Sequence, residues 1–155
     1  MRYLLDTHIW IWSLSDPDKL SKEVRAILSD PVNQLFISTI SIWEFLVLVE
    51  KERIFIDGTI DEWLAIAIDE ADIKELPLDK TIAIHSRRID LPHQDPADRF
   101  IAATAKVNEL TLITSDKKIV ASTRSATTKK LVDFFLFKIL SGFARLFQNF
   151  VNSFN

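Results

Sequence analysis

The sequence of 155 residues contains no cysteine and only two glycines, Gly58 and Gly142. Without cysteine there is no disulfide framework, no thiolate zinc site and no cysteine nucleophile, and the composition suits a reducing compartment. The two glycines cannot supply a P-loop, a dinucleotide-binding fingerprint or a nucleophile elbow, because each of these needs two or more glycines in one motif. These absences exclude thiol chemistry and disfavour nucleotide-cofactor chemistry.

Length, hydrophobicity and charge predict one ordinary domain. With 48% hydrophobic residues the chain can bury a core that is stable without disulfide bonds. The segment from Met1 to His8 includes an acid and a histidine where a secretory signal needs an unbroken apolar run, so we expect no signal peptide and a cytoplasmic protein. A formal net charge of -3 argues against a broadly basic coat. Any contact with RNA must therefore rest on local basic clusters and on bound metal.

Strand-like apolar runs alternate with segments of helical periodicity along the chain. The expected strands are residues 3–5, 35–37, 73–76 and 110–114. The expected helices are residues 9–14, 21–28, 40–49 with Ser38 or Thr39 as a cap, 60–68, 78–89 and a segment from Pro96 to Ala105 with Asp95 as its N-cap. The helix over 40–49 is apolar on most sides and is expected to be largely buried. This alternation predicts an α/β fold with a central parallel sheet and helices on both faces.

Acidic residues occur where a parallel sheet places its ligands. Asp6 and Asp116 each follow a strand-like run, and ligands bind outside the carboxyl ends of parallel strands. Asp98 lies in the first turn of the helix that Asp95 caps. Glu44 lies in the stretch 40–49, where an ionised carboxylate should be protonated, reach solvent at an edge or meet a cation.

Carboxylates without cysteine suit hard ions, so a site of Asp6, Glu44, Asp98 and Asp116 predicts Mg²⁺ or Mn²⁺. Such an ion can promote hydrolysis of a phosphodiester without a protein nucleophile. Taken one at a time, however, the aspartates also fit turn or capping residues, and Glu44 fits an edge position that faces solvent.

Four segments with these acids resemble the PIN-domain ribonucleases, and specifically the VapC-type toxins of bacterial toxin–antitoxin pairs. They are residues 4–10 (LLDTHIW), 41–44 (SIWE), 93–102 (HQDPADRFIA) and 114–116 (TSD). The resemblance implies a PIN-like three-layer sandwich, Mg²⁺- or Mn²⁺-dependent endoribonuclease activity on RNA, a homodimer and inhibition by a small antitoxin protein.

The same resemblance implies roles for single residues. Asp6 and Asp98 would be direct metal ligands, Glu44 a ligand or water-holder, and Asp116 a ligand acting directly or through water. Thr7 and Ser115 would position waters or phosphate.

Basic residues near these motifs have several interpretations. Arg99 follows Asp98 and faces about 100° away on the helix, where it could hold Asp95 or a substrate phosphate, although a surface ion pair is the simpler interpretation. The expected phosphate contacts are Arg87, Arg88, Lys117 and Lys118.

The resemblance covers roughly the first four-fifths of the chain, which predicts a PIN-like nuclease domain over 1–125 and an atypical C-terminal helical extension over 126–155. The extension carries an apolar stripe at helical spacing, interrupted by Lys138 and Arg145, so we expect an amphipathic helix for protein contact and no membrane span. The stripe consists of Leu136, Ile139, Leu140, Phe143, Phe147, Phe150 and Phe154.

Two rival functions remain open at this stage. A phosphoaspartyl phosphatase or receiver would also place an acid after its first strand, but His8 occupies the position of its second early aspartate. A non-catalytic PIN-like binding module, inactivated by the altered C-terminus, would keep the acids only as caps.

Overall fold

A computed structural model describes residues 1–91 and 95–115. Its sheet is parallel, with strand order β3-β2-β1-β4. The strands are β1 (Arg2–Leu5), β2 (Gln34–Ser38), β3 (Ile73–Leu76) and β4 (Thr111–Ile113). Leu5, the last residue of β1, pairs with Ile37 on one side and with Ile113 on the other. The carboxyl ends of β1, β2 and β4 therefore lie at the same edge of the sheet.

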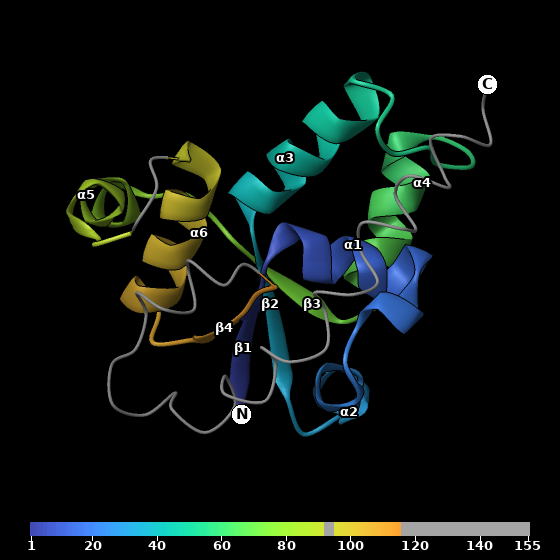
Figure 1. The fold of residues 1–155 in the computed structure, drawn as a ribbon, viewed down its shortest axis with the longest axis horizontal. Helices are drawn as coiled ribbons and strands as arrows, with labels where there is room; N and C mark the ends of the chain where they lie inside the picture. The colour runs from blue at the N-terminus through green and yellow to red at the C-terminus, as the bar shows by residue number, and fades with distance from the viewer. Residues whose placement is uncertain (92–94, 116–155) are drawn as a thin grey trace, which may run out of the picture. The chain divides into compact units, whose positions relative to one another are not determined.

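Helices cover both faces of this sheet (Figure 1). Figure 1 shows α5 and α6 on one face and α1, α2 and α4 on the other, while α3 continues from the end of β2. The helices are α1 (Thr7–Ser15), α2 (Lys22–Ser29), α3 (Thr39–Glu50), α4 (Ile60–Leu64), α5 (Lys80–Arg88) and α6 (Pro96–Val107), with a 3-10 turn η1 (Pro17–Lys19) and a π-helical segment η2 (Ala65–Glu70). The predicted α/β sandwich with a central parallel sheet is confirmed.

Short polar side chains begin most of these helices, because they accept hydrogen bonds from the first backbone N–H groups, which have no partner within the helix. Ser21 accepts from Val24 and Ser38 from Ile40. Thr59 forms a reciprocal capping box with Glu62, and Asp79 and Asp95 cap α5 and α6. Asp95 is the N-cap that the sequence predicts.

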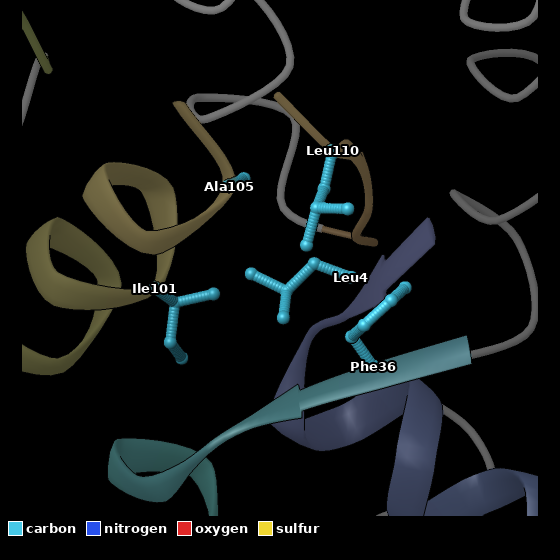
Figure 2. Packing of buried hydrophobic residues seen from close by; sticks show 5 residues of the cluster. All are labelled: Leu4, Phe36, Ile101, Ala105 and Leu110. Atoms are coloured by element: carbon cyan, nitrogen blue, oxygen red, sulfur yellow. The ribbon is translucent and has the colours of Figure 1, made fainter. Parts of the chain in front are cut away.

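The core lies on both faces of β1 and β2, since successive strand residues point to opposite sides. Leu4 and Phe36 pack toward α6 in a cluster completed by Ile101, Ala105 and Leu110 (Figure 2). Each of the large side chains contributes about 1.5–3 kcal/mol of hydrophobic stabilisation when fully buried. This packing holds α6 against the strands that lead to the candidate site.

A second apolar group joins α1, α3 and α4. The ring of Phe45 stacks on Trp63 with a centroid distance of 4.1 Å, and Trp10 meets both rings edge-on. The indole N–H of Trp10 donates to the Ala67 carbonyl at 3.0 Å, which satisfies the polar atom of this fully buried side chain. These contacts fix α3 relative to α1.

The expectation that α3 is largely buried holds only in part. Only Ser41 and Phe45 are buried on this helix, and the Trp43 side chain is 56% exposed. The helix packs on α1 and α6, most of its other residues are half-buried, and Trp43 and Glu50 are exposed. An apolar pattern around a helix does not ensure burial, because much of the surface of folded proteins is contributed by apolar atoms.

Within residues 1–91 and 95–115, none of the helices combines the length and apolar character that crossing a membrane requires. The predicted helical extension over 126–155 lies outside the described residues.

Candidate active site

Asp6 lies at the junction of β1 and α1 and caps this helix. Its backbone N–H donates to the Ile113 carbonyl at 2.9 Å, which continues the contact between β1 and β4. Its Oδ1 accepts the Thr7 N–H at 2.8 Å and its Oδ2 accepts the Thr114 hydroxyl at 2.6 Å. The carboxyl group is therefore held by hydrogen bonds from the start of α1 and from the residue that follows β4. Asp6 is only 5% exposed.

Glu44 reaches the same place from the second turn of α3. Its Oε2 accepts the hydroxyl of Thr7 at 2.6 Å. Thr7 is fully buried, and Glu44 is partly buried. Thr7 thus donates its backbone N–H to one acid and its side-chain O–H to the other.

Burial is the main electrostatic feature of Asp6. It raises the pKa of the carboxyl group, because loss of solvent penalises the charged form, and the negative charge of Glu44 acts in the same direction. The Thr114 hydroxyl, the charge of His8 and the Thr7 N–H favour the charged form and offset part of this effect. A cation near the two acids would stabilise both carboxylates.

Asp98 lies in the first turn of α6, and its position follows from the chain direction. Helix α6 ends at Val107, and β4 then starts at Thr111 beside Tyr3, near the amino ends of the strands. The helix must therefore begin on the side of the carboxyl edge, as Figure 1 shows. Asp95 Oδ1 accepts the N–H groups of Ala97 at 2.9 Å and Asp98 at 3.3 Å, which fixes this first turn.

The oxygen donors of Asp6 and Glu44 fit a hard divalent ion. Mg²⁺ commonly takes one or two carboxylates and completes its shell with water and substrate phosphate. In the part of the chain that the structure describes, no three histidine or acidic side chains form a group suited to a metal ion. The described site is thus a carboxylate pair with Asp98 on the same side of the sheet, and Asp116 lies outside the described residues.

Arg99 has a different role from the surface ion pair that the sequence favours. The side chain is 5% exposed, its Nε donates to the Ser86 carbonyl at 2.8 Å and its Nη2 to the Ile89 carbonyl at 2.8 Å. These carbonyls lie at the C-terminal end of α5, where they lack partners within the helix. Arg99 therefore joins the end of α5 to the start of α6.

Two hydroxyl groups were not among the candidate site residues. Thr114 bonds Asp6, and its only sequence signal is its place in the motif that precedes Asp116. Ser41 lies one turn before Glu44, and its buried Oγ has no hydrogen-bond partner among the described residues. The bond from Thr114 to Asp6 does not follow from residue type alone, because it depends on which elements meet.

Of the four expected phosphate contacts, two lie on described residues and two do not. Arg87 and Arg88 lie in the last turn of α5, which Arg99 ties to α6. Arg87 and Arg88 are both exposed. Lys117 and Lys118 lie outside the described residues.

Comparisons with known proteins agree with this architecture. Ribonuclease VapC22 from Mycobacterium tuberculosis is 29% identical over 119 residues, which cover 75% of this chain and 88% of the relative. A VapBC2 complex from Rickettsia felis bound to a promoter DNA fragment matches 79% of this chain and 94% of its own with a TM-score of 0.56 and 19% identity. A toxin–antitoxin complex from Klebsiella pneumoniae matches 79% and 92% with a TM-score of 0.55 and 24% identity.

The solved structures, at these identities, support the fold. The model of the PIN domain family matches residues 3–123, a range that includes β2, β3, β4, most of β1, and the positions of Asp6, Glu44 and Asp98. The resemblance drawn from the four sequence segments is therefore confirmed, and the chain belongs to the PIN domain family.

Proposed function

We propose that this chain is a VapC-type toxin that hydrolyses RNA phosphodiester bonds with the help of Mg²⁺ or Mn²⁺. The observation that carries the proposal is the buried carboxyl group of Asp6, which Thr7 links to Glu44 at the carboxyl edge of a parallel sheet. Ligands bind at this edge in open α/β sheets. The similarity to a relative named as a ribonuclease supports the same activity.

In this proposal Asp6, Glu44, Asp98 and Asp116 hold the metal. When bound, the ion supplies an activated water and neutralises charge on the phosphate oxygens. The protein supplies orientation: Thr114 and the Thr7 N–H hold Asp6, and the Thr7 hydroxyl holds Glu44. Without a protein nucleophile in the proposed site, the reaction would be direct hydrolysis.

We also propose a small antitoxin as the partner, a homodimer as the assembly and the cytoplasm as the location. The solved structures with this fold include complexes of toxins with antitoxins.

The activity can be tested by incubating purified protein with total cellular RNA in Mg²⁺, in Mn²⁺ and with chelator. We expect discrete cleavage products that form only when the metal is present. The rate of cleavage by Asp98→Asn should be at least about a hundredfold lower than that of the wild type, as for loss of a group that stabilises transition-state charge. Asp95→Asn is the matched control, because asparagine caps a helix as well as aspartate and removes an exposed charge from the same helix end.

Cleavage by Asp98→Asn at the wild-type rate would contradict the proposed site. Absence of metal-dependent cleavage by the wild-type protein would instead favour the non-catalytic binding module.

A second prediction concerns Arg87 and Arg88 as contacts to RNA phosphates. The double variant Arg87→Gln/Arg88→Gln should raise KM for RNA with little change in kcat, since both side chains lie in solvent. The salt dependence of binding should also weaken, by about 0.7 in the slope of log K against log salt for each lost contact to a single strand. Binding to a labelled RNA over a range of salt concentrations measures both effects.

The control is Lys51→Gln/Arg53→Gln, which removes two exposed cations after the far end of α3. An equal change in the salt slope for both double variants would show that the effect reflects total charge and would contradict a specific contact at α5.

A further inference from the structure

Thr7 donates hydrogen bonds to two acids from two different atoms. Its backbone N–H lies 2.8 Å from Asp6 Oδ1, and its Oγ1 lies 2.6 Å from Glu44 Oε2. We propose that Thr7 is a positioning residue whose hydroxyl holds Glu44 beside Asp6, so that both carboxylates can bind the same divalent ion. This inference rests on the proposed function.

The hydrogen bonds leave oxygen atoms available for a cation. A carboxylate oxygen has two lone-pair directions, and among the described residues Asp6 Oδ1, Asp6 Oδ2 and Glu44 Oε2 each accept one bond. The bond from Thr7 to Glu44 engages Oε2 and not Oε1. Thr7 and Thr114 therefore orient the two acids without occupying every ligand position.

A positioning group is needed because Asp6 and Glu44 belong to different elements. Thr7 and Glu44 are 37 residues apart in sequence, and a free glutamate side chain samples many rotamers. The two negative charges also repel each other, which would favour rotamers that separate them. A single hydrogen bond from a buried donor counters both tendencies.

Thr7 is well suited to this task. Its side chain is fully buried, and a β-branched side chain in a helix has few χ1 rotamers, so its hydroxyl direction is largely preset. Threonine hydroxyls in helices often bond a carbonyl of the preceding turn, as Thr104 does with the Phe100 carbonyl at 2.8 Å. Thr7, the first residue of α1, directs its hydroxyl to Glu44.

The test measures Mn²⁺ binding to the full chain by isothermal titration calorimetry, with no RNA present. Thr7→Val keeps the shape of the side chain and the backbone N–H bond to Asp6 but removes the hydroxyl. It should weaken Mn²⁺ binding by about 10- to 100-fold, which is the effect of removing other groups that orient metal ligands. Thr7→Ser keeps the hydroxyl and should restore most of the affinity. Thr104→Val removes an equally buried hydroxyl away from the acids and should bind Mn²⁺ like the wild type.

A double-mutant cycle provides a readout that a general loss of stability would not produce. If Thr7 acts through Glu44, Thr7→Val should weaken Mn²⁺ binding much less in a Glu44→Gln background than in the wild type. Thermal unfolding of each variant reports the fold. Should Thr7→Val not fold, Thr7→Ser against Thr7→Ala compares two small side chains that differ only by the hydroxyl.

Wild-type Mn²⁺ affinity in the variant without the hydroxyl, or additive effects in the cycle, would overturn the inference while leaving the metal-dependent function intact. Failure of the wild-type protein to bind Mn²⁺ would overturn the proposed metal site and this inference with it.

Discussion

Asp6→Asn is expected to lower RNA cleavage at least about a hundredfold while the free energy of unfolding stays equal to or above that of the wild type. Activity falls because the amide is a poorer metal ligand. Stability is kept because the carbonyl oxygen of the new amide can accept the Thr7 N–H, and its NH₂ group can donate to the Thr114 hydroxyl oxygen, in place of the two bonds of Asp6.

The pH dependence of this stability difference has a definite sign. Burial raises the pKa of Asp6 above its ordinary value of 3.8, so the ionised carboxylate destabilises the fold. The penalty is fully present above the raised pKa and is relieved as the pH falls through it toward 3.8. The gain in free energy of unfolding of Asp6→Asn over the wild type, measured with urea, should therefore be largest at neutral pH and smaller in acid.

Growth on expression provides the cellular measurement for the same variant. The wild-type chain should arrest growth, co-expression of the proposed antitoxin should relieve the arrest, and Asp6→Asn should not arrest growth. Asp57→Asn, at an exposed position, is the control. Toxicity of Asp6→Asn at the wild-type level would contradict the metal site, and a marked loss of stability would contradict the interpretation of Asp6 as a destabilising buried charge.

Arg99→Ala is expected to lower the free energy of unfolding by about 2–4 kcal/mol, because it leaves two carbonyls without their donors and removes a buried side chain. Arg99→Lys should recover little of this loss, since one ammonium group cannot reproduce the planar donor pattern of a guanidinium. Urea unfolding measures the difference, and hydrogen exchange should show the loss of protection at the end of α5.

The matched control is Arg53→Ala, where the arginine is exposed and the expected change is within about 0.5 kcal/mol. Full rescue by Arg99→Lys would show that charge alone matters and would argue against the role of the guanidinium in joining α5 to α6.

Several parts of the site could be predicted because their signals are local. Asp6 follows a three-residue apolar run, and Asp95 precedes a proline at the start of a helical pattern, so strand end and helix cap can be read from neighbouring residues. The outcome for Arg99 shows the limit of such reasoning. The sequence places Arg99 on the helix that Asp95 caps, as the structure does. The carbonyls that its side chain contacts, however, belong to Ser86 in α5 and to Ile89, the C-cap of α5.

The sequence by itself determined the alternation of strands and helices, the helix that Asp95 begins and the position of Asp6 at the end of a strand, because periodicity and capping act over a few residues. Only the tertiary structure decided that Thr7 bonds Glu44, that Thr114 bonds Asp6 across 108 residues, and that Trp43 is exposed. These features depend on strand register and on which helix faces find a neighbour. Contacts between distant segments of this kind are set by packing, which no local pattern specifies.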